Sequence, residues 1–104
     1  MKYYSVNVTE IAEIDLHDII TYIANQFDSE ETAKDMYDAV EKTLSSLTTF
    51  PERATLVDDD RLWLMGYRKI EIKNYLAFFT IDKQNAIVNV ERILYMRRDW
   101  EQIL

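Results

Sequence analysis

Apolar and polar residues alternate at the start of the chain. Tyr4, Val6 and Val8 occupy every second position, with polar residues between them. A period of two is what a half-buried strand requires, so we expect a strand that ends at Thr9. The hydroxyl of Thr9 can accept from a free backbone N–H group of the following turn, which predicts this residue as the N-cap of a helix.

The apolar positions then change to a helical period. Spacings of three, four and seven residues are typical of one face of an amphipathic helix. That stripe consists of Ala12, Leu16, Ile19, Ile20, Ile23 and Phe27. Asp15, Asp18, Asn25 and Gln26 lie off the stripe, and we expect them to face solvent.

A second helical stripe follows after a short break. Capping side chains and first-turn acids from Asp28 to Glu31 mark the end of one helix and the start of another. The new stripe consists of Ala33, Met36, Tyr37, Val40, Leu44 and Leu47, and it ends at Phe50-Pro51. Pro51 disfavours further helix. Two long helices with so short a connection are expected to pack antiparallel, as an αα-hairpin.

The residues from Gly66 to Trp100 predict three strands joined by tight turns. Residues 68–73 alternate between apolar and charged, and Asn74 marks a turn. Residues 75–81 are apolar on both faces, which favours a central strand. A polar loop at residues 82–85 separates this strand from a third strand at residues 86–95, whose apolar series Arg92 interrupts.

The remaining segments are shorter. Residues 52–62 predict an extended irregular connection, and Trp63 and Met65 predict the start of the second strand. A short last helix is expected with Asp99 as its N-cap and Trp100, Ile103 and Leu104 on one face. The predicted fold class is therefore α+β, with the order β-α-α-β-β-β-α and an antiparallel sheet packed against the αα-hairpin.

Length and composition limit the class of protein further. With 104 residues, one Gly and one Pro, we expect a single domain over residues 1–104 with few flexible loops. The chain has no cysteine, which excludes disulfides and zinc-thiolate sites. No apolar run approaches the length of a signal peptide core or a membrane span, so we expect a cytoplasmic protein without a membrane partner.

The net charge of -7 hides a difference between the two halves of the chain. Met1 to Asp60 carries 4 basic and 14 acidic residues, a net charge of -10. Arg61 to Leu104 carries 8 basic and 5 acidic residues, a net charge of +3. An acidic body with one basic face can still meet an anionic partner locally, although a solvated acidic helical surface explains the first half equally well.

Common catalytic and metal-binding motifs are absent from the sequence. The single histidine, His17, lies off the apolar stripe and cannot form a usual metal cluster by itself. The acidic run Asp58 to Asp60 lacks the glycine and the ligand spacing of a calcium loop. A phosphate-binding loop needs more glycine than the chain contains, and no cysteine or nucleophile turn is present. We expect neither a metal nor a cofactor.

Cations and aromatic side chains instead gather in the second half. They are Arg68, Lys69, Lys73, Tyr75, Arg92, Tyr95, Arg97, Arg98 and Trp100. Such groups can neutralise a phosphate or stack on an unpaired base. A strand that faces water carries the same residues, and Arg92 can equally pair with a helix carboxylate behind the sheet.

In these features the chain resembles the RelE/ParE superfamily of bacterial type II toxin-antitoxin toxins over nearly its whole length. The resemblance rests on the order and spacing of short segments: Asp15-Leu16, Tyr22-Ile23-Ala24, Leu47 to Arg53, Gly66-Tyr67-Arg68, Asn74-Tyr75, and Arg92 to Trp100. It implies a growth-inhibiting toxin of the kind found in plasmid stabilisation modules, neutralised by a cognate antitoxin. It also implies that the toxin alone does not bind DNA sequence-specifically.

The superfamily divides by target. RelE-like members cut mRNA in the ribosome, and the resemblance would then place Lys69, Tyr75, Arg97 and Arg98 in catalytic roles. ParE-like members poison DNA gyrase without chemistry of their own, with Arg68, Arg92, Arg97, Arg98 and Trp100 as candidate target-binding residues. An inactive or regulatory member that only binds its antitoxin is a third alternative.

This sequence departs from the RelE-like pattern at two cations. Glu71 stands where RelE-like enzymes carry a second lysine, and Leu76 stands where they carry an arginine. Trp100 is the nearest aromatic residue to their C-terminal tyrosine. In-line cleavage needs an acid, a base and phosphate clamps together, so these losses favour the ParE-like alternative.

Overall fold

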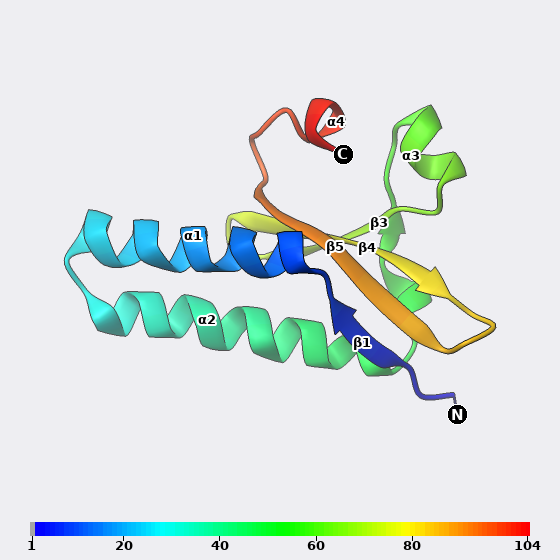
Figure 1. The fold of residues 1–104 in the computed structure, drawn as a ribbon, viewed down its shortest axis with the longest axis horizontal. Coiled ribbons are helices and arrows are strands. Elements are labelled where there is room, and N and C mark those ends of the chain that lie inside the picture. Colours follow the sequence, from blue (N-terminus) through cyan, green and yellow to red (C-terminus); the bar gives the residue numbers. More distant parts are fainter. Residues whose placement is uncertain (1) are drawn as a thin grey trace.

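The structure is a computed structural model that describes residues 2–104, and Figure 1 shows its arrangement. The elements in chain order are β1 (Ser5–Val8), α1 (Glu10–Phe27), α2 (Glu30–Ser45), the 3-10 helices η1 (Ser46–Thr48) and η2 (Pro51–Arg53), β2 (Thr55–Leu56), α3 (Asp60–Leu64), β3 (Arg68–Ile72), β4 (Tyr75–Asp82), β5 (Ile87–Tyr95) and α4 (Trp100–Ile103). The predicted α+β class and its αα-hairpin on a sheet are confirmed.

The five strands form one sheet in the order β1-β5-β4-β3-β2. The pairs β2–β3, β3–β4 and β4–β5 are antiparallel, whereas β1 runs parallel to β5. The sheet is therefore mixed, although the sequence predicted it to be antiparallel. No hairpin turn sets the direction of the β1–β5 pair, because Ser5 and its partner Ile87 are separated by almost the whole chain.

Both faces of the sheet are covered, and β4 is an inner strand, as its apolar run predicted. Ala77 and Phe79 belong to the main core beneath α1 and α2, while Leu76 and Phe78 belong to a second cluster on the opposite face. We call these the helix face and the C-terminal face. The C-terminal face is covered by residues of α3 and α4, which lie across the sheet from the αα-hairpin in Figure 1.

The ends of the two long helices follow the predicted capping pattern. The backbone N–H of Ala12 donates to the hydroxyl of Thr9 at 3.1 Å, and the N–H of Thr32 donates to the hydroxyl of Ser29 at 3.1 Å. Phe27 was predicted on the buried stripe but is 62% exposed. The reason is visible in Figure 1, where the connected end of the hairpin extends beyond the strands that would cover it.

The segment before β3 differs from the prediction. Trp63 lies in α3 and Met65 at its C-terminal end, so neither starts a strand, and the edge strand β2 lies earlier, at Thr55–Leu56. The carboxylate of Asp59 accepts from the backbone N–H of Leu62 at 3.0 Å and caps α3. Residues 52–62 are therefore more regular than expected.

A single glycine ends α3. Gly66 has φ +80, which a residue with a side chain adopts only with strain. Its N–H donates to the carbonyl of Trp63, and the N–H of Tyr67 donates to the carbonyl of Leu62. These two bonds form a Schellman motif, which satisfies carbonyls at the helix end and turns the chain into β3.

The last helix packs on the C-terminal face, as its apolar face predicted. Trp100, Ile103 and Leu104 all contact the second cluster. Asp99 occupies the N-cap position but its side chain makes no capping hydrogen bond. The guanidinium of Arg61 donates to the carbonyls of Glu101 and Leu104 at 3.0 and 2.8 Å and so fastens α4 to α3. None of the helices within residues 2–104 is long and apolar enough to cross a membrane.

Candidate functional site

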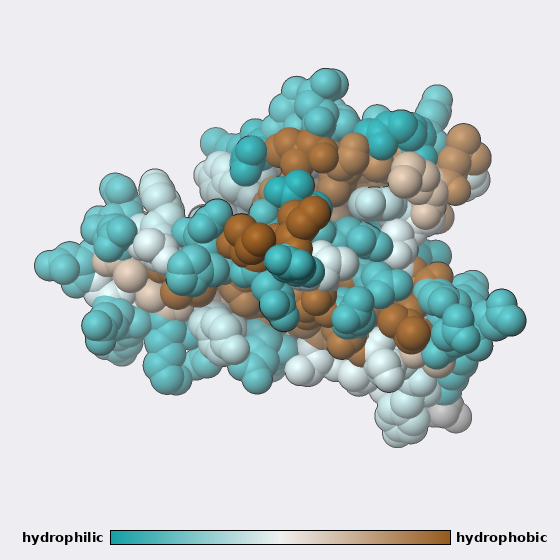
Figure 2. Space-filling model, viewed as in Figure 1, coloured by the Kyte–Doolittle hydropathy of each residue, from teal (hydrophilic) through white to brown (hydrophobic). Residues whose placement is uncertain are grey.

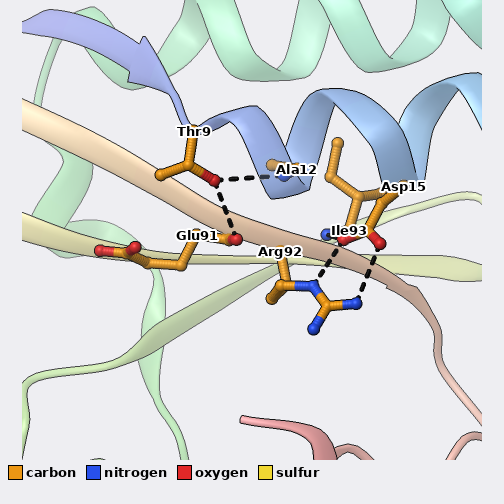
Figure 3. Close-up of polar contacts among 6 residues, drawn as sticks. All are labelled: Thr9, Ala12, Asp15, Glu91, Arg92 and Ile93. Atoms are coloured by element: carbon orange, nitrogen blue, oxygen red, sulfur yellow. Dashed lines mark hydrogen bonds and ion pairs between the residues drawn. The ribbon is translucent and has the colours of Figure 1, made fainter.

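Arg92 is held by the first helix rather than presented to solvent. Its Nε donates to one carboxylate oxygen of Asp15 at 2.8 Å and its Nη2 to the other at 3.0 Å (Figure 3). The side chain of Asp15 is only 12% exposed, so the expectation that it faces solvent is wrong. The hydrogen bonding of Arg92 to the Asp15 carboxylate, partly opposed by burial, raises the pKa of Arg92 above its ordinary value.

The position of Asp15 follows from the unequal lengths of the two strands. β1 pairs with β5 only as far as Val90, and α1 then lies beside the rest of β5. The hydroxyl of Thr9 donates to the carbonyl of Glu91 at 3.1 Å, and the N–H of Ile93 donates to Asp15 at 3.0 Å (Figure 3). Side chains of α1 thus satisfy backbone groups along β5 where strand pairing stops.

A β-bulge in β5 contributes to this arrangement. Phe78 pairs with Arg92 and Phe79 with Val90, which leaves Glu91 as an extra residue in β5. The extra residue changes which positions face the helices, from Val88 and Val90 before the bulge to Ile93 after it. This change of phase explains why Arg92 interrupts the apolar series of the third predicted strand.

Arg68 is also engaged within the fold. Its Nη1 donates to the carbonyls of Glu52 and Ala54 at 3.0 and 2.7 Å. It thereby fixes the connection between η2 and β2 against β3. The side chains of Arg68 and Arg92, two of the candidate target-binding residues, are therefore both bound by other parts of the chain.

Lys69 and Trp100 lie together on the C-terminal face. The Nζ atom of Lys69 is 5.5 Å from the centre of the Trp100 ring, which itself lies 5.4 Å from the ring of Phe78. Both residues line a groove of about 620 Å³, which we call the Lys69 groove. Arg53 also lines it, but the Arg53 guanidinium donates to the carbonyls of Ser46, Thr49 and Phe50. Lys69 is the second cation of this groove, and the carboxylate-bearing Glu71 also lines it.

Tyr75 and Arg98 lie in a different groove. They line a hollow of about 770 Å³ between the αα-hairpin, the β3–β4 turn and the end of β5, which we call the hairpin groove. The rings of Tyr75 and Tyr95 meet edge to face at 5.7 Å. Burial, together with Tyr22 and Tyr95, raises the pKa of Tyr75 and keeps its hydroxyl protonated at neutral pH.

The strand register separates Lys69 from Tyr75. Lys69 pairs with Phe78, which belongs to the cluster on the C-terminal face. Tyr75 pairs with Ile72 and packs with it against the core on the helix face. Residues paired across a ladder point to the same side of the sheet, so the two side chains lie on opposite faces.

Two of the candidate arginines lie just after the end of β5. Arg97 and Arg98 follow the last strand and are both exposed, and neither forms an ion pair within the described residues. Arg98 shares the hairpin groove with Lys73, whereas Trp100 points to the C-terminal face. Arg97 and Arg98 together are called the C-terminal basic surface below.

Within residues 2–104, no three or more metal-binding side chains gather in one place.

Exposed apolar residues were not anticipated by the sequence analysis. Trp63, Leu64 and Met65 around the end of α3 are 54%, 78% and 55% exposed. A capping side chain three residues before Leu62 was the available signal for α3.

The fold is similar to that of solved toxin–antitoxin structures. Solved structures that resemble the chain include a "Chromosomal ParDE TA system from P. aeruginosa", with a TM-score of 0.75, 15% identity, and coverage of 91% of this chain and 98% of that chain. The toxin–antitoxin complex RelBE2 from Mycobacterium tuberculosis is similar with a TM-score of 0.62, 21% identity, and coverage of 89% and 98%. The architecture is thus that of RelE/ParE-like toxins.

The sequence itself identifies the family. Residues 6–100 match the family described as "ParE toxin of type II toxin-antitoxin system, parDE". The chain therefore belongs to the ParE toxin family of type II toxin-antitoxin systems, which confirms the resemblance to the RelE/ParE superfamily. No curated protein sequence matches it.

Proposed function

We propose that this toxin binds and poisons DNA gyrase in the cytoplasm, without cutting RNA, and that a cognate antitoxin neutralises it. The observation that carries the proposal is the location of Lys69 and Tyr75 on opposite faces of the sheet. In-line RNA cleavage needs a proton donor, a proton acceptor and phosphate clamps around one reacting group. Side chains separated by a sheet cannot converge in that way.

The remaining cations support binding rather than chemistry. Arg68 and Arg92 are held by carbonyls and by Asp15. Arg97 and Arg98 are exposed, and arginine is a residue type that contributes strongly to protein interfaces. The net charge of -7 also disfavours a partner made of phosphate backbone alone.

A cognate antitoxin is the second partner. Both similar structures are of toxin–antitoxin systems, and the family to which the chain belongs is defined by such a system. An antitoxin would explain how a cell tolerates a growth-inhibiting protein. Any small reading frame next to the toxin gene is the candidate to test.

One observation favours the alternative of a ribosome-dependent ribonuclease. Lys69 beside the Trp100 ring offers a cation and a stacking surface in one groove, which would suit an unpaired base. If this alternative holds, the toxin cleaves mRNA and does not inhibit gyrase, and Lys69→Ala abolishes the cleavage.

Two assays with the purified toxin separate these proposals. One measures supercoiling of relaxed plasmid by gyrase, and the other measures cleavage of mRNA on translating ribosomes. We expect inhibition of supercoiling, intact mRNA, and restoration of supercoiling when the antitoxin is added. Normal supercoiling with cleaved mRNA would overturn the gyrase proposal, and no effect in either assay would indicate a regulatory member that only binds its antitoxin.

A further inference from the structure

The end of α3 presents three large apolar side chains in succession. Trp63, Leu64 and Met65 are each more than half exposed, and we call them the α3 ridge. Figure 2 shows apolar surface over α3, at the upper right of the view, with hydrophilic surface beside it. Single exposed apolar residues are common on monomeric proteins, but a run of consecutive ones indicates a surface that another molecule covers.

The fold holds this ridge in a fixed position. The carboxylate of Asp59 caps α3, the side chain of Leu62 anchors it in the second cluster, and Gly66 ends it in the Schellman motif. The guanidinium of Arg61 also donates to two carbonyls of α4. Because the ridge is already ordered in the free toxin, covering it costs little conformational entropy.

The charge beside the ridge is negative. Asp58 and Asp60, before and at the start of α3, are exposed, and neither forms an ion pair within residues 2–104. Arg61 is the only cation of α3, and its guanidinium is bound to carbonyls of α4. A surface that combines apolar contact with cations is therefore complementary to the ridge.

The same chain carries cations that suit this role. Arg97 and Arg98 are exposed in the connection from β5 to α4, and no ion pair among the described residues uses either of them. Figure 1 shows this connection and α3 on the same side of the sheet, with α4 between them. A two-fold axis beside α4 brings the ridge of each copy to the arginines of the other, so that both contacts form together.

We propose that the toxin forms a two-fold dimer in which the α3 ridge and its two acids meet the C-terminal basic surface of a second copy. The net charge of -7 on each copy opposes association, but salt screens that repulsion beyond about 8 Å at physiological ionic strength. The apolar part of the contact is small compared with that of a stable interface. We therefore expect a weak dimer with a Kd of about 10–100 µM.

Dimerisation covers the candidate effector site. Arg97 and Arg98 are the residues proposed to contact the target, so this consequence rests on the proposed function, whereas the self-association does not. Only the monomer presents both arginines to the target. The activity of each toxin molecule should therefore decrease as the toxin concentration rises above the Kd.

Sedimentation velocity of the toxin without its antitoxin tests the self-association. Between about 1 and 300 µM the mean mass should rise from that of a monomer toward that of a dimer. Leu64→Lys should raise the Kd by about 10-fold or more, because it places a charge in the apolar contact. The control Phe27→Lys changes an exposed apolar residue at the end of α1 and should have no effect. A monomer at every concentration, or a Leu64→Lys variant that dimerises like the unmodified toxin, would overturn the proposal.

Exchange of charges tests which surfaces meet. Asp58→Arg with Asp60→Arg should prevent self-association, and Arg97→Asp with Arg98→Asp should do the same, because each change places like charges at both contacts. An equimolar mixture of the two double variants should form dimers again, since the mixed dimer has opposite charges at both contacts. If the mixture stays monomeric while both variants keep the circular dichroism of the unmodified toxin, the proposed pairing is wrong.

The supercoiling assay separates this proposal from the proposed function. Leu64→Lys, in which dimerisation is weakened, should inhibit gyrase at least as strongly as the unmodified toxin, and weaker inhibition would overturn the regulatory consequence. If the unmodified toxin inhibits gyrase and sediments as a monomer at every concentration, only the dimer proposal fails. If the dimer forms with the expected charge dependence but supercoiling is unaffected, only the proposed function fails.

Discussion

Removal of the Asp15 carboxylate should destabilise this toxin more than any other single change at a polar residue of α1. Asp15 accepts three hydrogen bonds, two from the Arg92 guanidinium at 2.8 and 3.0 Å and one from the N–H of Ile93 at 3.0 Å. Asp15→Ala leaves both donors without this acceptor. The substitution therefore leaves the N–H of Ile93 on β5 and the largely buried guanidinium of Arg92 without their partner.

The expected magnitude follows from the degree of burial. Breaking a fully buried ion pair by removing one partner typically destabilises a protein by about 3–5 kcal/mol. The side chains of Arg92 and Asp15 are 23% and 12% exposed, so water can partly solvate the guanidinium that remains. We therefore expect Asp15→Ala to lower the free energy of unfolding by about 2–3 kcal/mol. Arg92→Ala should lower it less, by about 1–2 kcal/mol, because Asp15 keeps its bond to Ile93.

Urea unfolding followed by tryptophan fluorescence and circular dichroism measures these differences. With a slope of about 1.5 kcal/mol per molar urea, the Asp15→Ala midpoint should fall by roughly 1.5 M. The matched control is Asp18→Ala, an exposed acid on the same helix, which should change stability by less than about 0.5 kcal/mol. The double variant Asp15→Ala, Arg92→Ala should show a coupling energy of at least about 1 kcal/mol.

Two results would refute this reasoning. A loss for Asp15→Ala as small as that for Asp18→Ala would mean that the ion pair does not hold β5 to α1. A coupling energy near zero would mean that Asp15 stabilises the fold only through Ile93, and that Arg92 is free to contact the target after all.

Three further predictions concern other parts of the molecule. The double variant Arg97→Ala, Arg98→Ala should abolish growth arrest without changing the melting temperature, and the control Lys34→Ala, Lys42→Ala on α2 should leave growth arrest intact. Persistent toxicity of the arginine variant would exclude the C-terminal basic surface as the effector site. Trp100→Ala should lower the free energy of unfolding by about 2 kcal/mol, because the Trp100 ring packs on Phe78. The control is Trp63→Ala, which should lower it by less than about 1 kcal/mol because Trp63 is mostly exposed, and equal losses would show that α4 is not docked. The pKa of Glu52 is lowered, chiefly by its own backbone N–H and also by the Tyr4 hydroxyl, so its contribution to stability is present above the unfolded pKa and is lost as pH falls below about 4. In unfolding experiments at graded pH, the stability of Glu52→Gln should therefore fall less steeply at acid pH than that of the unmodified toxin.

Local patterns predicted most of the fold. The period-two alternation before Thr9, the helical stripes and the polar loop at residues 82–85 each describe neighbours in sequence, and the strands and helices lie where these patterns place them. The region before Gly66 failed for a local reason. Asp59 was weighed as part of an acidic run that might bind metal, although its spacing from Leu62 is that of a helix cap.

Contacts between distant residues could not be predicted in the same way. Asp15 and Ile93 are joined by a hydrogen bond across 78 positions, and nothing in either local pattern specifies the other residue. The bulge at Glu91 also depends on the register of β4 against β5. The separation of Lys69 from Tyr75 follows from the position of one turn. Ile72 pairs with Tyr75 across that turn, so these two side chains share a face of the sheet, and Lys69, three positions before Ile72, lies on the other face.

The parallel pair between β1 and β5 also bears on how the toxin is made. β1 leaves the ribosome before its partner β5, which begins at Ile87, and both long helices are made between them. Until then the αα-hairpin has no complete sheet to pack on, and the main core cannot close. A shortened translation product that stops before β5 should therefore stay unfolded and harmless.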